Sequence, residues 1–279
     1  MKVCSTPAEL RLARGEMHGS IGFVPTMGAL HDGHLALVQR AREETDNIIL
    51  SIFVNPTQFA SDSEAALYPR TLDHDLTLAE AAGVTTMFTP STNDLFPTGF
   101  STFIDVGDVA GLLEGAARPG HFRGVATVVA KLLNIVRPNR AYFGQKDAQQ
   151  AFIIRRMAED LDQGLEIVVC PTVREADGLA LSSRNVYLSP EQRGQAPTLR
   201  RALEEAERLV AAGERSAAAV KAAVGAMLAE APLGRQDYVE LVETAGLQPV
   251  QRLRGEVLLA LAVWFGNTRL IDNTIMLAE

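Results

Sequence analysis

Two histidines, His31 and His34, lie three residues apart in a segment whose sequence could bind an anion. The segment, residues 25–34, reads Pro-Thr-Met-Gly-Ala-Leu-His-Asp-Gly-His. An apolar run at 21–24 precedes it and a helical pattern at 35–44 follows it, which predicts a strand, a tight turn at the two glycines and a helix. A helix N-terminus attracts anions through its unpaired N–H groups and its dipole. Because residues three apart share a helix face, we expect an anion bound here to meet both imidazoles.

Two other interpretations of the histidine pair stay open. A His-x-x-His pair can supply half of a zinc site, although the chain has no HExxH sequence and no cysteine or third histidine near the pair. The pair can also be an ordinary feature of a surface or a partly buried turn. The signatures G-x-G-x-x-G and G-x-x-x-x-G-K-[ST] are absent from the chain, so neither of these phosphate-binding loops is expected. Of the three interpretations, the residues favour the anion-binding turn.

Three further polar clusters follow apolar runs that are typical of buried strands. They are Asn55–Gln58, then Gly144–Asp147 with Gln149 and Gln150, and finally Leu181–Arg184. Open parallel sheets bind ligands at the carboxyl ends of their strands, so we expect these clusters to line one crevice with the histidine segment. Together they offer cations, hydroxyls and amides, a set suited to a polyphosphate. Taken singly, each has a simpler explanation as a turn, a helix start or a surface charge.

Strand and helix patterns alternate along the first part of the chain. Apolar runs predict strands at residues 21–24, 47–54, 84–88, 101–106, 140–143 and 166–170. Helical patterns lie before or between them, at residues 7–14, 35–44, 72–82, 125–136 and 148–161. This alternation predicts an α/β fold with a Rossmann-like, doubly wound parallel sheet.

The sequence changes character after Pro171. A polar stretch at 177–185 leads to a capping box, Ser189–Gln192, which has a proline at the first helical position. Helices are expected from there to about residue 212 and at 216–229, and strands at 237–243, 256–265 and 268–276. This order predicts a smaller C-terminal α+β domain with an antiparallel sheet. We place the two domains at residues 1–174 and 175–279.

The bulk composition excludes several classes of protein. The chain has 279 residues, of which 47% are hydrophobic and 22% charged, and its net charge is −8. Nucleic-acid-binding proteins normally have a basic surplus, so no nucleic-acid partner is expected. Two cysteines, Cys4 and Cys170, are too few for a disulfide scaffold, and no apolar run is long enough to span a membrane. With no signal-peptide pattern either, these features predict a soluble cytoplasmic protein without a membrane partner.

The motifs resemble those of one enzyme family. The segment ending at His34 resembles the His-x-Gly-His signature of the nucleotidylyltransferase superfamily, and Ser182–Arg184 stands where that superfamily keeps its second phosphate motif. More narrowly, the chain resembles the pantoate–β-alanine ligase family over essentially its whole length. The matching stretches are 25–34, 53–59, 68–71, 121–125, 142–150, 172–185 and 268–273. Gln145 stands at a position where Glu is also common in the family.

The resemblance implies a reaction. The family joins pantoate to β-alanine with ATP, through a pantoyl-adenylate, and releases pyrophosphate and AMP. The resemblance therefore implies three small-molecule substrates, with Mg²⁺ accompanying the ATP, and a homodimer. It also implies that the first domain binds the nucleotide and pantoate and that the second is a lid. It assigns no metal ligands.

The resemblance also implies roles for individual residues. His34 would be the proton donor to the leaving pyrophosphate, with His31 and Lys146 as the other catalytic residues. The implied ATP-binding residues are Met27, Gly28, His31, His34, Gly144, Gln145, Lys146, Asp147, Val173, Leu181, Ser182, Ser183 and Arg184. The implied pantoate- and β-alanine-binding residues are Gln58, Gln150 and Asn55. Neither cysteine lies in a candidate site, so no covalent enzyme intermediate is expected.

The glycine-rich stretch at 114–124 has two interpretations. It contains Arg118 and His121, and it is either a loop that closes over the intermediate and excludes water or an ordinary surface loop.

Three rival functions also stay open beside the ligase. They are the transfer of AMP to a phosphate-bearing substrate, the silent binding of an adenine nucleotide by a sensor, and the charging of tRNA. The net charge of −8 counts against a tRNA substrate.

Overall fold

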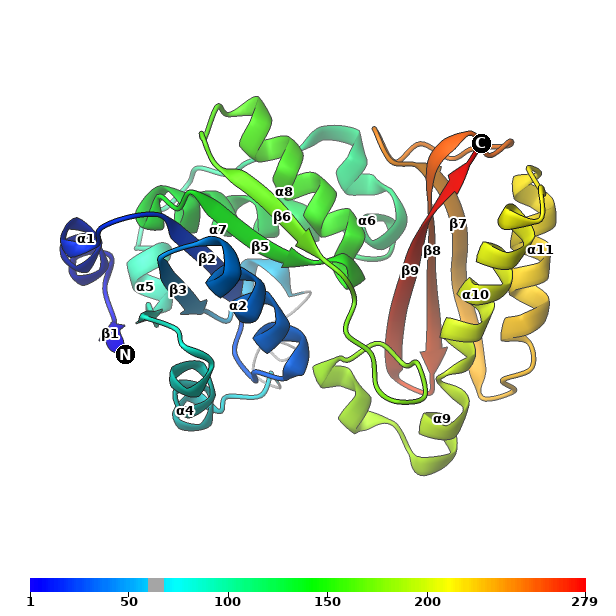
Figure 1. Ribbon diagram of the computed structural model, residues 1–279, viewed down its shortest axis with the longest axis horizontal. Helices are drawn as coiled ribbons and strands as arrows, with labels where there is room; N and C mark the ends of the chain where they lie inside the picture. The colour runs from blue at the N-terminus through cyan, green and yellow to red at the C-terminus, as the bar shows by residue number, and fades with distance from the viewer. Residues whose placement is uncertain (60–67) are drawn as a thin grey trace. The chain divides into compact units, whose positions relative to one another are not determined.

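The computed structural model describes residues 1–59 and 68–279, and Figure 1 shows its helices and strands. The chain forms two compact units. The first consists of Met1–Gln145 and Gln149–Pro171, and the second of Lys146–Ala148 and Thr172–Glu279. The short turn at Lys146–Ala148 therefore belongs to the second unit, although the segments on either side of it belong to the first.

The first unit is built on a six-stranded parallel sheet, and the prediction of a Rossmann-like, doubly wound fold is confirmed. Its strands are β1 (Lys2–Cys4), β2 (Ile21–Thr26), β3 (Asn47–Ile52), β4 (Thr86–Phe88), β5 (Arg140–Gly144) and β6 (Glu166–Cys170). They lie in the order β1-β4-β3-β2-β5-β6. The chain order reverses at β2, which pairs with both β3 and β5. This is the switch point at which doubly wound sheets bind their ligands, beside the carboxyl ends of β2 and β5.

Helices cover both faces of this sheet (Figure 1). On one face α1 (Pro7–Glu16), α7 (His121–Val136) and α8 (Ala148–Asp160) share a core with strand residues such as Phe23 and Ile49. On the other face α2 (Asp32–Glu44) and α4 (Leu72–Ala82) pack with the next residues along, Val24 and Leu50. Successive residues of a strand point to opposite faces, so these apolar pairs require helices on both sides. The described part of the unit also contains two shorter helices, α5 (Thr92–Leu95) and α6 (Leu113–Ala117).

One strand expected in this unit is not formed, and one observed strand was not predicted. Residues 101–106 form no strand, because the alternation there reflects packing on α7. The Ile104 N–H donates to Thr127 Oγ1 at 2.9 Å, and the Arg123 guanidinium stacks on the Phe103 ring at 4.0 Å from its centroid. Conversely, β1 was not predicted, since it has three residues and only Cys4 among them is buried.

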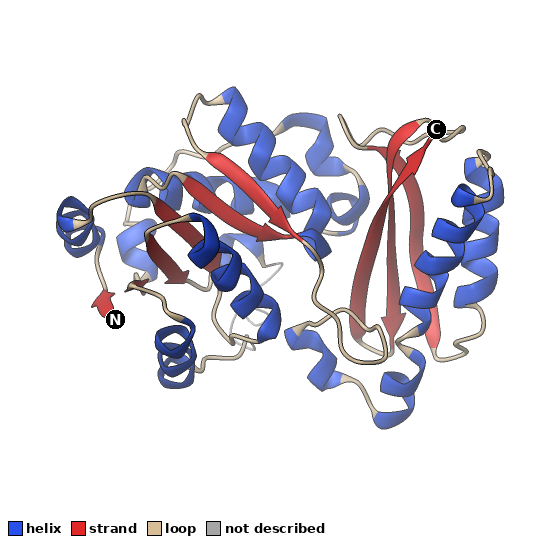
Figure 2. Ribbon diagram, in the orientation of Figure 1, coloured by secondary structure: helices blue, strands red, loops and turns tan. Residues whose placement is uncertain are grey.

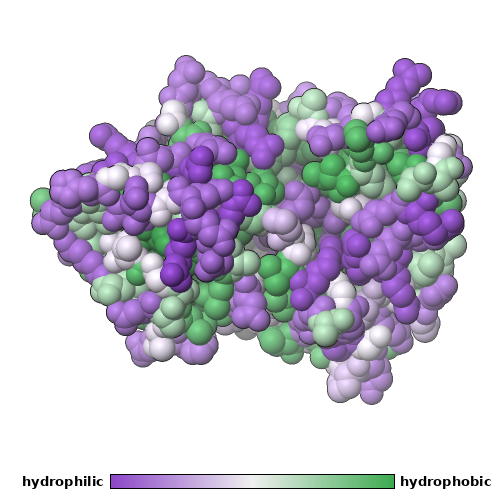
Figure 3. Space-filling view, in the orientation of Figure 1, coloured by the Kyte–Doolittle hydropathy of each residue, from purple (hydrophilic) through white to green (hydrophobic). Residues whose placement is uncertain are grey.

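The second unit is an antiparallel sheet with helices on one face, which confirms the predicted α+β architecture. Its strands β7 (Gly234–Glu243), β8 (Gly255–Phe265) and β9 (Thr268–Ala278) lie in that order. Figure 2 shows α10 (Thr198–Ala211) and α11 (Ala217–Leu228) together against this sheet. Leu203 and Val220 of the helices share a core with Leu259 and Leu261 of β8. The outward side of α10 is hydrophilic in Figure 3, as its Arg- and Glu-rich sequence requires.

One expected helix of the second unit is in fact two. The capping box predicted at Ser189 forms, with Gln192 as its partner, and it starts α9 (Pro190–Gln195). The chain then breaks at Ala196–Pro197 before α10 begins. Proline lacks the N–H that would continue the helix, so the continuous helix expected to about residue 212 is not formed.

Candidate active site

His31 caps the N-terminus of α2 and His34 lies in its first turn, after the turn at residues 27–30 that follows β2. Nδ1 of His31 accepts the Gly33 N–H at 3.1 Å, and Nδ1 of His34 accepts the His31 N–H at 3.4 Å. The two rings lie 4.1 Å apart between centroids. Because Nδ1 of each ring accepts a hydrogen bond, each neutral imidazole carries its proton on Nε2. Gly33 permits this arrangement, since a Cβ at its position would meet the His31 ring at 2.8 Å.

A buried carboxylate holds the turn that leads to the histidines. The turn contains two residues of positive φ, Gly28 at 88° and Ala29 at 51°. Asp75 of α4, which is 1% exposed, accepts the N–H groups of Ala29 and Leu30 at 2.9 and 2.8 Å. The hydroxyl of Thr71 donates to the same carboxylate at 3.2 Å. Asp75 is therefore tied to the backbone of the histidine turn.

Asp75 is not among the site residues predicted from the sequence, although the sequence contains a signal for it. It stands four residues before Ala79 on α4, and both side chains are buried. A carboxylate at a core position of an amphipathic helix needs polar partners. The sequence thus indicates that Asp75 needs hydrogen-bond partners. It does not indicate that these partners are the N–H groups of Ala29 and Leu30.

Asn55 and Gln58 form a second polar turn in the same unit, after β3. Asn55 is 1% exposed, and its Nδ2 donates to Gln58 Oε1 at 3.1 Å and to the Gly124 carbonyl at 3.2 Å. Nε2 of Gln58 lies 2.8 Å from Sδ of Met27. The structure thus links Met27, Asn55 and Gln58 directly.

The stretch at 114–124 is more ordered than the predicted loop. It contains α6 and the start of α7, which begins at His121 and not at the expected residue 125. Arg118 Nη2 and His121 Nδ1 both donate to the carbonyl of Gln58, at 3.1 and 2.9 Å. A Cβ at Gly124 would lie 2.4 Å from the Thr57 carbonyl oxygen, so the close contact needs a glycine. This stretch therefore holds the main chain of the Gln58 turn.

The two glutamines in the first turn of α8, Gln149 and Gln150, differ in their surroundings. Gln149 is buried, and its Nε2 donates to the carbonyls of Val109 and Leu112, both at 2.8 Å. Its Oε1 accepts the Glu114 N–H at 2.9 Å. These bonds make Gln149 a structural residue. Gln150, the predicted ligand, is only partly buried in the first turn of α8.

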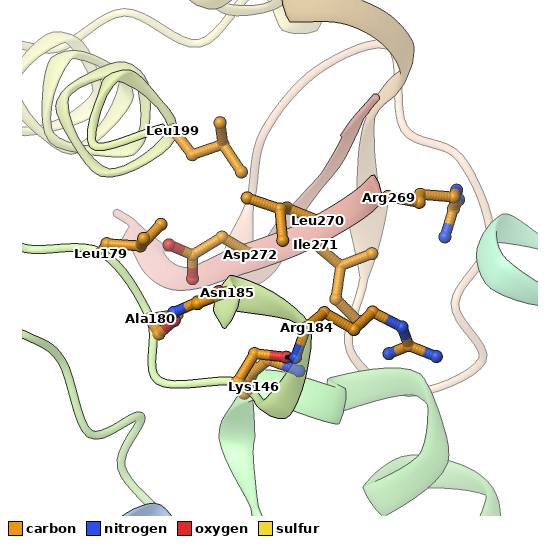
Figure 4. A pocket seen from close by; sticks show the side chains of 11 residues that line it. Lys146, Leu179, Ala180, Arg184, Asn185, Leu199, Arg269, Leu270, Ile271 and Asp272 are labelled. Atoms are coloured by element: carbon orange, nitrogen blue, oxygen red, sulfur yellow. Dashed lines mark hydrogen bonds between the residues drawn. The ribbon is translucent and has the colours of Figure 1, made fainter. Parts of the chain in front are cut away.

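The second unit has its own polar pocket, which Figure 4 shows from close by. Its polar lining residues are Lys146, Ser182, Arg184, Asn185, Arg269 and Asp272. The Lys146 ammonium lies 3.6 Å from the Asp147 carboxylate. Lys146 and Arg184, both predicted to bind phosphates, thus line one pocket together with Arg269, whose guanidinium is paired with the Asp237 carboxylate at 2.8 Å.

A hairpin positions the predicted Leu181–Arg184 cluster. The Leu181 N–H donates to the Val173 carbonyl at 2.9 Å, which joins two of the predicted nucleotide-binding residues. Ser182 then caps the short 3-10 helix Ser183–Tyr187, and its Oγ accepts the Arg184 N–H at 3.2 Å. One turn therefore carries the hydroxyls of Ser182 and Ser183 and the guanidinium of Arg184.

The predicted site residues divide between the two units. The first unit contains Met27, Gly28, His31, His34, Asn55, Gln58, Gly144, Gln145 and Gln150, and the second contains Lys146, Asp147, Val173, Leu181, Ser182, Ser183 and Arg184.

The described residues offer no ready metal site and no reactive thiol. In residues 1–59 and 68–279, no three His, Cys, Asp or Glu side chains cluster closely enough to hold a metal ion, so the zinc interpretation of the histidine pair gains no further ligands there. Cys4 and Cys170 are free and buried, and burial raises the pKa of both thiols, which makes them poor nucleophiles.

No helix within residues 1–59 and 68–279 is long and apolar enough to cross a bilayer.

Comparison with known proteins identifies the family. The family model described as pantoate-beta-alanine ligase matches residues 2–275. Pantothenate synthetase of Roseiflexus castenholzii is 54% identical over 276 residues, covering 99% of each chain. The crystal structure of pantothenate synthetase from Thermus thermophilus is similar with a TM-score of 0.93 and 48% identity, over 98% of this chain and 99% of that one.

A second solved structure adds ligands to the comparison. The pantoate-beta-alanine ligase of Francisella tularensis, complexed with beta-gamma ATP and beta-alanine, has a TM-score of 0.81 and 34% identity over 99% of this chain and 97% of that one. The similarity thus extends from one end of the chain to the other, in sequence and in fold. The chain belongs to the pantoate–β-alanine ligase family.

Proposed function

We propose that this chain carries out the reaction of its family, the ATP-dependent joining of pantoate to β-alanine, and that it does so through a pantoyl-adenylate. The observation that carries the proposal is the His31–His34 turn at the carboxyl end of β2, in a chain that matches the family from residue 2 to residue 275. Ligand binding at this switch point is the rule for doubly wound sheets.

In the first step, a carboxylate oxygen of pantoate attacks the α-phosphorus of ATP. The bond from that phosphorus to the bridging oxygen breaks, and negative charge grows on the leaving pyrophosphate. A preorganised donor aimed at this charge lowers the barrier. His34 is that donor in the proposal, because its Nδ1 accepts a backbone hydrogen bond and its proton therefore lies on Nε2. His31 binds the phosphate beside it in the same tautomer.

The phosphates of ATP are assigned to the pocket of the second unit. Lys146 and Arg184 supply charge there, and the hydroxyls of Ser182 and Ser183 supply neutral donors. Mg²⁺ enters as part of the ATP substrate. Mg²⁺ is normally held by phosphate oxygens and water with one or two carboxylates. Binding of Mg²⁺ together with ATP therefore does not require a cluster of three metal-binding side chains, and the described residues contain none.

Main-chain groups frame the rest of the nucleotide in this proposal. They come from the turn after β2 (Met27 and Gly28), from the end of β5 (Gly144 and Gln145), and from Asp147, Val173 and Leu181. The hydrogen bond between Leu181 and Val173 supports a common role for these two residues.

Pantoate is assigned to the amide side chains of Gln58 and Gln150, with Asn55 in support. An amide offers both a donor and an acceptor, which suits a ligand with hydroxyls and a carboxylate. Hydrogen bonds to Gln58 support the assignment. Asn55 donates to its side-chain oxygen, and Arg118 and His121 donate to its main-chain carbonyl, so both the side chain and the main chain of Gln58 are held in place.

In the second step, the amine of β-alanine attacks the acyl carbon of the mixed anhydride. The new amide bond forms as the bond from that carbon to the AMP oxygen breaks, and AMP leaves. Water would otherwise hydrolyse the adenylate, so the site must exclude it.

The dependence of each product on each substrate tests the proposed reaction. We expect pantoate alone to support exchange of labelled pyrophosphate into ATP, and AMP to accumulate in stoichiometric amount with amide product only when both pantoate and β-alanine are present. Formation of AMP without pantoate would favour an AMP transferase. Tight ATP binding with no pyrophosphate release would favour a nucleotide sensor.

We also propose that the protein is a cytoplasmic homodimer. Two buried free thiols are compatible with a reducing compartment, and the family is usually dimeric. Sedimentation analysis at micromolar concentration is expected to give about twice the monomer mass of 30.1 kDa. A single species of 30.1 kDa would contradict the dimer.

A further inference from the structure

Two neighbouring polar residues on β9, Asp272 and Asn273, have no part in the reaction described above. They close the 268–273 stretch that matches the family. Both are buried, with 2% and 5% exposure, although β9 lies in a sheet with an apolar core. Buried polar groups are costly unless they are hydrogen-bonded, so their partners indicate what they do.

Asp272 holds the hairpin that ends in the Ser182–Arg184 turn. Its two carboxylate oxygens accept from Nη1 and Nη2 of Arg174 at 2.6 and 3.0 Å. Nη1 of Arg174 also donates to the Gly178 carbonyl at 3.0 Å. A bidentate pair of this kind fixes orientation as well as distance. The strand β9 thus sets the position of the hairpin through Asp272.

Asn273 holds a segment that is 127 residues away in the sequence. Its Nδ2 donates to the main-chain carbonyl of Lys146 at 2.9 Å. Successive residues of a strand point to opposite faces, and Asp272 pairs in register with the core residue Leu261. Asn273 therefore projects from the opposite face to Asp272, so that two adjacent residues hold two separate segments.

We infer that Asp272 and Asn273 are positioning residues that fix Lys146 and the Ser182–Arg184 turn relative to one another, as one binding surface for polyphosphate. This inference rests on the proposed function, which assigns the phosphates of ATP to these groups. Figure 4 shows Lys146, Arg184 and Asp272 around the common pocket. Neither positioning residue touches the phosphates in this scheme. Each acts through the main chain or the arginine that it holds.

The inference predicts a selective loss for Asn273→Ala. The alanine variant lacks the hydrogen bond from the Asn273 amide to the Lys146 carbonyl. The main chain of Lys146 is then held less firmly, and so is the position of its side-chain ammonium. We expect the affinities for MgATP and for pyrophosphate to fall about tenfold. The affinities for AMP and pantoate are expected to change less than twofold, because these ligands lack the polyphosphate that the inferred surface binds. Isothermal titration of each ligand into the full-length protein measures all four.

Thr274→Val is the matched control. Thr274 is the next residue on β9, and its hydroxyl donates to Glu207 of α10 at 2.7 Å. The control therefore removes one side-chain hydrogen bond from the same strand without touching the pocket. It is expected to leave all four affinities unchanged. Asn273→Asp is a near-isosteric second variant that removes the donor, and it replaces Asn273→Ala if that protein does not fold.

The outcomes separate the inference from the proposed function. Selective loss of MgATP and pyrophosphate in the Asn273 variants, with the control unchanged, supports the inference. Unchanged affinities, or a parallel loss of AMP and pantoate, overturns it. If the unmodified protein binds neither MgATP nor pyrophosphate, the proposed function itself is wrong.

Discussion

At the scale of single residues, the histidine pair depends on backbone hydrogen bonds. The Nδ1 atoms of His31 and His34 each accept an N–H group, so both neutral rings carry their proton on Nε2. The turn therefore fixes the orientation of both rings.

His34→Ala is expected to lower the rate of adenylate formation by about two to four orders of magnitude, since a transition-state donor is lost. Pantoate-dependent exchange of pyrophosphate into ATP measures this step alone. A loss smaller than about tenfold would remove His34 from the role of donor.

Gln58→Ala is expected to raise KM for pantoate by at least about tenfold while KM for ATP changes little, because a side-chain amide held by Asn55 and Met27 is lost. Gln149→Ala provides the contrast. Gln149 bonds to the carbonyls of Val109 and Leu112, so its loss should lower the melting temperature and not act on KM. Equal effects of Gln58→Ala on both substrates would contradict the assignment to pantoate.

At the scale of elements, the turn after β2 is held by α4 through Asp75. The carboxylate accepts two consecutive N–H groups at a turn where Ala29 has positive φ. Asp75→Ala leaves both N–H groups without that acceptor, so we expect a loss of about 2–4 kcal/mol in the free energy of unfolding.

Asp75→Asn tests whether this anchor also matters for catalysis. The amide keeps one oxygen acceptor but cannot accept both N–H groups as well as the Thr71 hydroxyl. We expect kcat to fall about tenfold with KM for pantoate unchanged, because the histidines shift relative to the reacting phosphate. Thr71→Val, which removes only the hydroxyl, serves as the control. A variant with wild-type kcat would show that the turn keeps its geometry without the carboxylate.

The sequence was sufficient to predict most elements but not the contacts between them. Apolar runs and capping motifs are local patterns, so the first located strands such as β3 and β6 and the second located the capping box at Ser189. The bonds from Asp75 to Ala29 and from Asn273 to Lys146 join residues 46 and 127 positions apart. No local pattern encodes such pairs. For the same reason, the alternation at 101–106 was misread as a strand, although it reflects packing on α7.

At the scale of the whole molecule, the predicted site residues come from two compact units. The first contains the histidine turn and the Gln58 turn, and the second contains the Lys146 pocket. Each unit has its own core, and each holds its site residues through buried polar groups. The reaction proposed here requires both sets of residues to act on one ATP molecule.

The stability of the second unit should depend on the Arg174–Asp272 pair. Asp272 is 2% exposed, and its loss leaves the guanidinium without its carboxylate. We expect Asp272→Ala to lower the free energy of unfolding by about 3–5 kcal/mol, as measured by urea denaturation. Arg156→Ala, which breaks an exposed i,i+4 pair with Asp160, should cost less than about 1 kcal/mol. Similar losses for the two variants would contradict a structural role for the buried pair.

The most direct test of the central claim is a crystal structure of this protein with a non-hydrolysable ATP analogue and Mg²⁺. We predict that Nε2 of His34 and Nζ of Lys146 both lie within hydrogen-bond distance, about 3 Å, of oxygens of the same triphosphate. A structure in which the triphosphate contacts only one of these two side chains would contradict it.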